Sequence, residues 1–195
     1  MEDNCASDLV FDSDSMPFNI PLPEWTSIWW KWLHSIPADT SPALDSTGQF
    51  CSKSQNFSRV WFLAGTFGDS VTRKCTIPYG RAILFPIITC IFSFALDPHL
   101  KTEEQLIKAV RKDIDTVEYL GLTIDQIDFK ELNRFRVISN PFDDVIDGVK
   151  TKTVSDGYWI FVKPPKIGDH TIYFKGKNID FFNEVMYNIS IIPSP

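Results

Sequence analysis

Residues 24–36 show a strong periodic pattern of hydrophobic and polar positions, which predicts a helix. At helical spacing their apolar side chains form one stripe that we expect to be buried, made of Trp25, Ile28, Trp29, Trp32, Leu33 and Ile36. Pro37 ends this helix, because the residue before a proline avoids helical backbone angles. Trp30 falls outside the stripe. It is either covered by the N-terminal arm or a neighbouring loop, or exposed to a partner, and we favour coverage.

A second, longer amphipathic helix is predicted over residues 102–120. Thr102 and Gln105 have the spacing of a capping box, in which each side chain bonds to the backbone of the other residue. Gly121 supplies the glycine that commonly follows the end of a helix. The apolar stripe of this helix contains Leu106, Val110, Ile114 and Val117. Its opposite face is charged with both signs, which is typical of a solvated surface.

Most of the remaining chain has the short apolar or alternating runs that predict β-strands. Residues 70–77 alternate, so that one strand face carries Val71, Arg73, Cys75 and Ile77. Further strand-like runs, separated by turn residues, are 58–65, 81–94, 134–139, 158–164, 169–176 and 183–192. This succession favours an α+β fold built on an antiparallel β-sandwich of Ig-like or jelly-roll-like type.

Residues 1–22 differ from the rest, because they are acidic and punctuated by prolines. We predict an extended, partly disordered arm there, followed by a single domain over residues 23–195. The most apolar run, residues 82–96, is too short to span a membrane and contains Pro86. The acidic start also lacks the pattern of a signal peptide, which favours a cytoplasmic location.

Composition and charge exclude some partners. The chain has 195 residues, a net charge of −6 and 14% aromatic residues, which suits one domain with a substantial core. Proteins that bind nucleic acids usually carry a basic stripe. Basic residues are scattered here, so we expect neither nucleic acid nor an anionic membrane as a partner. The oligomeric state does not follow from these features.

The cysteines allow two interpretations. Cys51 and Cys75 each lie at the border of a strand-like segment, and their spacing leaves open whether they form a disulfide or remain thiols. Cys90 lies in an apolar run, where a free buried thiol is the simpler interpretation.

Several segments resemble a group of uncharacterised bacterial and archaeal proteins, many of which are secreted. They are VWFLAGTFG…RKCTIPYGRAILFPI (60–87), FRVISNPF (135–142) and SDGYWIFVKPPKIGDHTIYFKG (155–176). The resemblance covers about residues 25–192. It implies a stand-alone domain with a terminal Ig-like hairpin, a disulfide between Cys51 and Cys75, and an extracellular or envelope location. It implies no activity, and the chain differs from the group in having no signal peptide.

Metal-binding patterns are weak. The three histidines do not have the spacing that places two imidazoles on one face, so we predict no transition-metal site. The loop after residue 140 contains Asp143, Asp144 and Asp147, whose oxygens are the kind that Ca²⁺ prefers. Their spacing matches no EF-hand, and a solvated acidic turn is the simpler interpretation. Calcium is therefore the alternative, and no other cofactor is predicted.

A ligand surface is the remaining hypothesis for a site. Flat aromatic side chains with polar neighbours suit sugar rings or a protein partner. The candidates are Trp30, Tyr158, Trp159, Tyr173 and His170, although core packing is the simpler interpretation of each. Adjacent strand residues face opposite ways, so at most one of Tyr158 and Trp159 can be available.

These observations lead to a prediction of function. We expect a binding or structural module of an extracellular or envelope setting that recognises a glycan or a protein. The alternative is a hydrolase-type enzyme that uses loop carboxylates or a reduced cysteine. The sequence contains no nucleophile elbow and no phosphate-binding loop, so the enzyme is the less favoured hypothesis.

Overall fold

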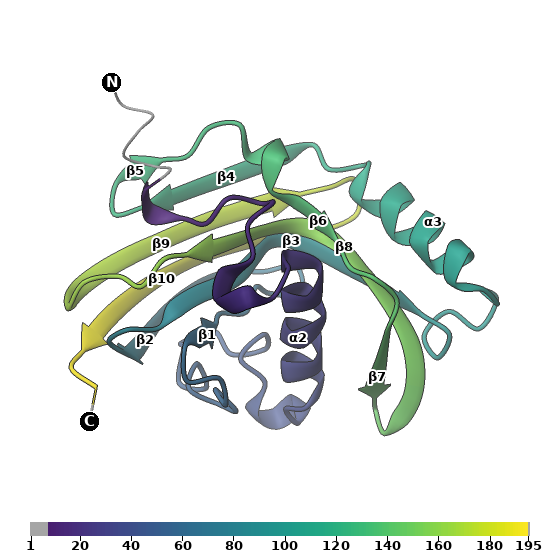
Figure 1. Cartoon of the computed structure of the whole chain (residues 1–195), viewed down its shortest axis with the longest axis horizontal. Coiled ribbons are helices and arrows are strands. Elements are labelled where there is room, and N and C mark those ends of the chain that lie inside the picture. Colours follow the sequence, from purple (N-terminus) through teal and green to yellow (C-terminus); the bar gives the residue numbers. More distant parts are fainter. Residues whose placement is uncertain (1–7, 195) are drawn as a thin grey trace.

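The computed structural model describes residues 8–194, which contain two α-helices and two five-stranded sheets (Figure 1). The helices are α2 (Leu22–His34) and α3 (Glu103–Ile114). The strands are β1 (Val60–Phe62), β2 (Ser70–Pro78), β3 (Ala82–Ser93), β4 (Tyr119–Ile124), β5 (Ile127–Asp128), β6 (Arg136–Ile138), β7 (Phe142–Ile146), β8 (Val149–Val162), β9 (Gly168–Lys177) and β10 (Phe182–Ile192). The predicted α+β class is confirmed. No helix within residues 8–194 is long and apolar enough to cross a membrane.

The first sheet has the strand order β1-β3-β8-β6, with β7 pairing to β8 as well. β3 and β8 form its long antiparallel centre, and their register shifts between Pro86 and Ile88. A proline has no N–H to donate, so an irregularity at this point is expected. β1 runs parallel to β3 and pairs only with Ala82, Ile83 and Leu84. Beyond Leu84, no described strand lies along that edge of β3.

The second sheet has the order β2-β10-β9-β4-β5, and β10 runs parallel to β2 along their whole paired length. Both sheets are therefore mixed: most pairs are antiparallel, as expected for the predicted antiparallel sandwich, but β1–β3 and β2–β10 are parallel. The turn after Pro78 does not close a hairpin, because β2 and β3 belong to different sheets. Tyr79 instead donates its backbone N–H to the carbonyl of Ile192. The two sheets do not close into a barrel.

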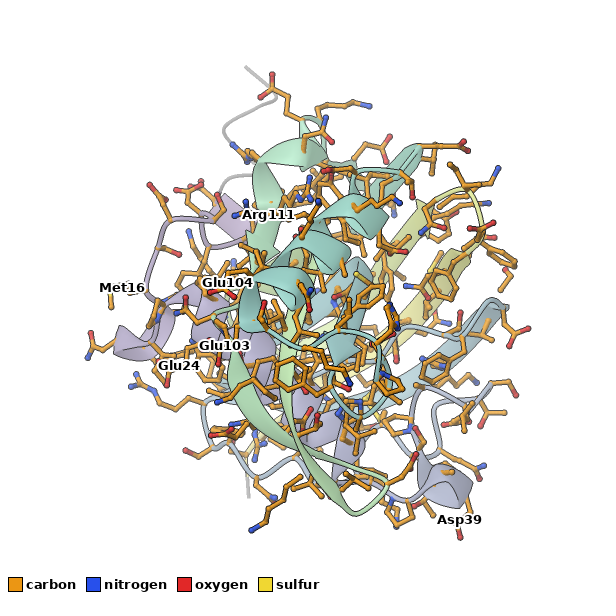
Figure 2. The ribbon with its side chains drawn as sticks, turned by 90° about the vertical axis from the view of Figure 1, so that its right-hand side faces the viewer. Met16, Glu24, Asp39, Glu103, Glu104 and Arg111 are labelled. Carbon is orange, nitrogen blue, oxygen red and sulfur yellow. A yellow bond between two sulfur atoms is a disulfide. The ribbon has the colours of Figure 1, made fainter. Side chains whose placement is uncertain are left out.

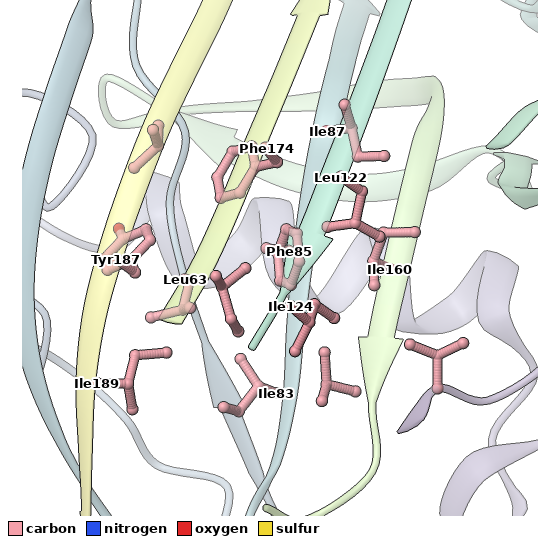
Figure 3. Close-up of a cluster of buried hydrophobic side chains, with 14 of the residues drawn as sticks. Leu63, Ile83, Phe85, Ile87, Leu122, Ile124, Ile160, Phe174, Tyr187 and Ile189 are labelled. Atoms are coloured by element: carbon pink, nitrogen blue, oxygen red, sulfur yellow. The ribbon is translucent and has the colours of Figure 1, made fainter. Parts of the chain in front are cut away.

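The main core lies between the sheets (Figure 3). The rings of Phe85 and Phe174, one from each sheet, stack with their centroids 4.7 Å apart. Around them lie aliphatic side chains from both sheets, including Ile83, Ile87, Ile160, Leu122, Ile124 and Ile189. Inward-facing positions on β3 and β8 are buried against the other sheet, as expected from the alternation of a strand.

The tryptophan-rich helix α2 packs on the other face of the first sheet (Figure 1). Trp29 contacts Trp159 of β8 with 5.3 Å between ring centroids. The three inward indoles each donate to a backbone carbonyl at 3.0 Å: Trp25 to Pro17, Trp29 to Leu63 and Trp32 to Lys53. The predicted stripe is buried except at Ile28, which is half-buried, although the helix ends at His34, before Ile36. These three indole N–H groups have the partners that buried tryptophans require.

The described part of the N-terminal arm packs on this same layer. Leu9 accepts a hydrogen bond from the backbone of Lys163, and Phe11 donates one to Phe161, both at 2.8 Å. Val10 between them is buried. Residues 8–22 thus lie against the end of β8, while residues 1–7 of the predicted arm are outside the described residues.

Helix α3 begins as predicted but ends earlier. The capping box of Thr102 and Gln105 is present, and Glu103, Glu104 and Arg111 project away from the body of the protein (Figure 2). The predicted extension to residue 120 is wrong. Glu118 donates its backbone N–H to Lys177, and β4 begins at once. Pairing with β9 therefore overrides the helical period, and Gly121 lies within a strand.

Candidate functional site

A cavity of about 300 Å³ lies along the open edge of β3. We call it the Trp30 pocket. Residues from α2, β3 and α3, from the loop at residues 65–69, and from residues 178–183, where a loop leads into β10, surround it. Its apolar lining includes Trp29, Trp30, Leu33, Phe67, Ile88 and Phe181. Ligand sites are commonly concave and mostly apolar, with a few polar groups, and this cavity lies at the small end of their usual size range.

The loops of the Trp30 pocket are fixed to each other through Asn183, which is buried. Its side-chain oxygen accepts from the backbone N–H of Thr66 at 2.7 Å and from the hydroxyl of Thr66 at 3.1 Å. Its amide donates to the carbonyl of Ile87 at 2.8 Å. A methyl group on Gly65 would lie 2.6 Å from this amide, so glycine permits the close approach. The lining is therefore preformed by satisfied hydrogen bonds.

Arg73 holds the backbone behind the pocket lining in place. Its guanidinium is buried, and it donates to the backbone carbonyls of Ala43, Asp45, Ala64 and Gly65 at 2.6 to 3.2 Å. Two of these residues, Ala43 and Gly65, line the Trp30 pocket. The alternation in β2 correctly placed Arg73 on the inward face.

The pocket has a negative electrostatic character. Asp113 and Asp180 belong to its lining, and no lysine or arginine among the described residues does. Neither carboxylate forms an ion pair within residues 8–194. The pKa of the Cys90 thiol, also in the lining, is raised far above its usual value by burial and by the charge of Asp113. Cys90 is therefore protonated at neutral pH and is a weak nucleophile.

Exposed apolar side chains occur in the same two segments: Phe67 belongs to the pocket lining, and Ile179 and Phe182 adjoin lining residues in the sequence. Phe67 is 60% exposed, Ile179 66% and Phe182 38%. Exposed apolar side chains that gather around a concave site are typical of interaction surfaces. We call these three residues the apolar rim.

The predicted aromatic site residues differ in how far they are buried. Trp30 is 7% exposed, so its predicted coverage is confirmed, and it lines the pocket. Tyr158 is also buried, and Trp159 is fully buried under Trp29, so neither offers a surface to a ligand. Tyr173 is half-buried on the second sheet and donates to Glu184 at 2.8 Å. Burial and this hydrogen bond raise the pKa of Tyr173 to about 12.

His170 does not belong to the Trp30 pocket but lines a different hollow, and both of its ring nitrogens are engaged. Nδ1 lies 2.6 Å from the carboxylate of Asp125, and Nε2 lies 2.8 Å from the carbonyl of Lys166. Burial alone would lower the pKa of His170, but these two acceptors raise it above its usual value. Because both partners are acceptors, the imidazolium form, in which both nitrogens donate, satisfies both contacts and is the form that they favour.

The predicted calcium ligands do not converge. Asp143 is exposed and pairs with Lys152 at 2.7 Å, whereas Asp144 is buried and lies 2.8 Å from Nδ1 of His34. Successive residues of β7 face opposite ways, which separates these two carboxylates. Asp147 lies in the turn after β7. Within residues 8–194, no group of three or more His, Cys, Asp or Glu side chains could hold a metal ion.

The open question about the cysteines is resolved. Cys51 and Cys75 form a disulfide, with their Cα atoms 5.9 Å apart. The bridge ties the loop before β1 to the edge strand β2. Cys90 is a free thiol.

Sequence reasoning missed four residues of the site: Phe67, Asp113, Asp180 and Phe181. Phe67 precedes Gly68 and Phe181 follows Asp180, in short loops where a large apolar residue is unusual and is a usable signal. Asp113 and Asp180 have no such signal, because their importance depends on where α3 and the last loop meet.

Comparisons with known proteins add little. No protein-family model matches the chain, and no curated protein matches it significantly. One solved structure, the solution structure of amebosin, matches with 9% sequence identity and a TM-score of 0.27. This match covers 70% of the present chain and 100% of the other. At such a low TM-score no argument rests on it. The resemblance to bacterial and archaeal proteins stays a prediction.

Proposed function

We propose that this chain is a non-enzymatic binding module, and that it binds a protein partner at the Trp30 pocket and its apolar rim. The observation that supports this function best is the apolar rim, which consists of Phe67, Ile179 and Phe182 and accompanies a preformed cavity. The disulfide supports an extracellular or envelope setting, because such bridges persist in oxidising compartments. A sandwich of Ig-like or jelly-roll-like type remains our proposal for the scaffold.

A protein fits this surface better than a glycan. Sugar rings stack on flat, accessible aromatic faces, whereas Trp30 and Trp159 are buried. The exposed side chains of the rim are large and apolar, as in the centre of protein interfaces.

The alternative of a hydrolase has less support. Cys51 and Cys75 are joined, and Cys90 is protonated at neutral pH, so no described thiol is activated for attack. Asp143 and Asp144, which the sequence placed in a loop, lie in strand β7, where they are paired with basic side chains rather than aimed together at a substrate.

Site-specific photo-crosslinking of the full chain, in extracts of the cells that produce it, tests the proposed function. A photoreactive phenylalanine analogue replaces Phe67, and a matched chain carries it at Leu96, which is 52% exposed and outside the lining. We expect an adduct from position 67 that excess wild-type chain suppresses. An Ile179→Ser, Phe182→Ser double variant should suppress it poorly. Equal adducts from position 96, or equal competition by the double variant, would contradict the proposal.

A further inference from the structure

Of the features that the proposed function leaves unexplained, the two carboxylates of the Trp30 pocket are the clearest. A pocket that received only apolar side chains would have no use for them. Asp113 and Asp180 lack an ion-pair partner among the described residues. Asp113 is half-buried and Asp180 is exposed, so solvent reaches both carboxylates and both are available to a cation that enters the cavity.

The position of Asp113 is unfavourable for a negative charge. It lies in the last turn of α3, where the partial negative charge of the helix end disfavours an anion. Arg111 and Lys112 in the same turn are exposed and form no ion pair with it. Their charges complement the helix end from outside, whereas Asp113 lines the cavity. The carboxylate therefore sits where the local structure repels it.

The neighbouring groups add to the negative field. The Sγ of Cys90 lies 3.7 Å from the carbonyl of Val110, so the carbonyl end of α3 reaches the cavity. Burial, and then the charge of Asp113 and a hydrogen bond with it, raise the pKa of the Cys90 thiol, so Asp113 lies close to this thiol. A cation placed here would gain from Asp113 and from the helix end together.

Aromatic rings complete the arrangement. Trp29, Trp30, Phe67 and Phe181 line the cavity, and aromatic faces attract cations through their quadrupoles. Aromatic rings with carboxylates and no basic group form a chemical environment that recognises an organic cation with an apolar body. The volume of about 300 Å³ suits one long side chain rather than a large ligand.

We infer that the Trp30 pocket receives an organic ammonium or guanidinium group, presented by the partner protein as a lysine or arginine side chain. This inference rests on the proposed function. The apolar stem of the side chain packs between Trp30 and Phe181, while the cationic head lies between Asp113 and Asp180. The apolar rim then contacts the surrounding surface of the partner.

Titrations followed by NMR on the full chain test the inference, with resonances of Trp30 and Asn183 as the readout. The probes are a glycine-flanked lysine peptide, the same peptide with norleucine, and free n-butylammonium. We expect the lysine peptide to bind on the order of tenfold more tightly than the norleucine peptide, and salt to weaken its binding. If n-butylammonium binds as tightly as the lysine peptide, the pocket recognises the cation itself. Tighter binding by the peptide indicates a protein source.

The matched variants are Asp113→Asn and Asp180→Asn, with Asp39→Asn as the exposed control outside the pocket. Each pocket variant should lower the affinity for the lysine peptide about fivefold, whereas the control should leave it unchanged. Thermal melting checks that each variant is folded. Equal affinity for lysine and norleucine, or no effect of either pocket variant, would overturn the inference. If the crosslink at position 67 persists in that case, the proposed function stands without it. If the preference for lysine and the crosslink at position 67 are both absent, the inference and the proposed function are both overturned.

Discussion

Removing the disulfide by a Cys51→Ala, Cys75→Ala double substitution should destabilise the protein without unfolding it. The bridge closes a loop with a sequence separation of 24 residues. In the loop-entropy model, releasing a loop of this length returns about 11.6 cal/mol/K to the unfolded chain, or about 3.4 kcal/mol at about 25 °C. For a domain of this size, that corresponds to a fall in melting temperature of roughly 7 to 14 °C.

The native loop should survive the substitution, because it has its own hydrogen bonds. Asp45 accepts from the backbone N–H of Thr47 at 2.8 Å and from that of Phe50 at 3.0 Å. Those hydrogen bonds also lower the pKa of Asp45, although burial opposes the effect. The loss of stability should therefore arise mainly in the unfolded state.

Guanidinium unfolding without reductant, followed by tryptophan fluorescence, measures the difference in free energy. Cys90→Ala is the control, because it removes a thiol and leaves the bridge intact. Reduction of the wild-type chain should match the double variant, and reduction of the double variant should change nothing. A loss below about 1 kcal/mol would refute the loop-entropy account.

Three further predictions concern charged groups. Arg73→Met should cost about 3 to 5 kcal/mol in urea unfolding, because it leaves buried carbonyls without a donor, and Arg73→Lys should cost less. His170→Gln should destabilise the protein at about pH 5.5, and the difference should vanish at high pH. The raised folded pKa of His170 means that the stabilisation is complete below the unfolded pKa and is lost as the pH rises through the folded pKa. Alkylation of Cys90 should be slow at neutral pH and faster in Asp113→Asn, whose lost charge lowers the thiol pKa. An unchanged rate in that variant would contradict the negative field in the pocket.

Local features of this fold could be predicted from the sequence because their causes are local. The capping box of Thr102 and Gln105 depends on residues three positions apart, and both of its hydrogen bonds are present. The buried faces of α2 and β2 follow from their periodicity alone. These properties depend on the short segment itself and not on its tertiary contacts.

The pairing of strands could not be predicted in this way. β2 and β10 are separated by most of the domain, yet they lie side by side and parallel. The tight turn at Gly80 is equally compatible with a hairpin and with a crossing between sheets, and only tertiary packing selects the crossing. The same cause ends α3 early, since residues 119–124 gain a full ladder of hydrogen bonds with β9.

The candidate site shows a similar division. Trp30 attracted notice because it fell outside the apolar stripe of its helix, and it does line the pocket. Trp159 and Tyr158 were candidates on composition alone, and both proved buried. The acidic residues of the site, Asp113 and Asp180, come together only where the end of α3 meets the last loop. The periodicity of the sequence does not predict this contact.

The burial of Arg73 raises the question of whether this residue serves to stabilise the fold or to position the walls of the Trp30 pocket. Taking a guanidinium out of water is costly, so burying Arg73 is poor design for stability alone, even though the carbonyls around it now depend on its hydrogen bonds. Arg73 instead holds the backbones of Ala43 and Gly65, which are two walls of the Trp30 pocket, while Asn183 holds a third at Thr66. Both anchors act on loops that would otherwise move independently. Because these buried polar groups gather behind the pocket, we infer that its shape is what they maintain.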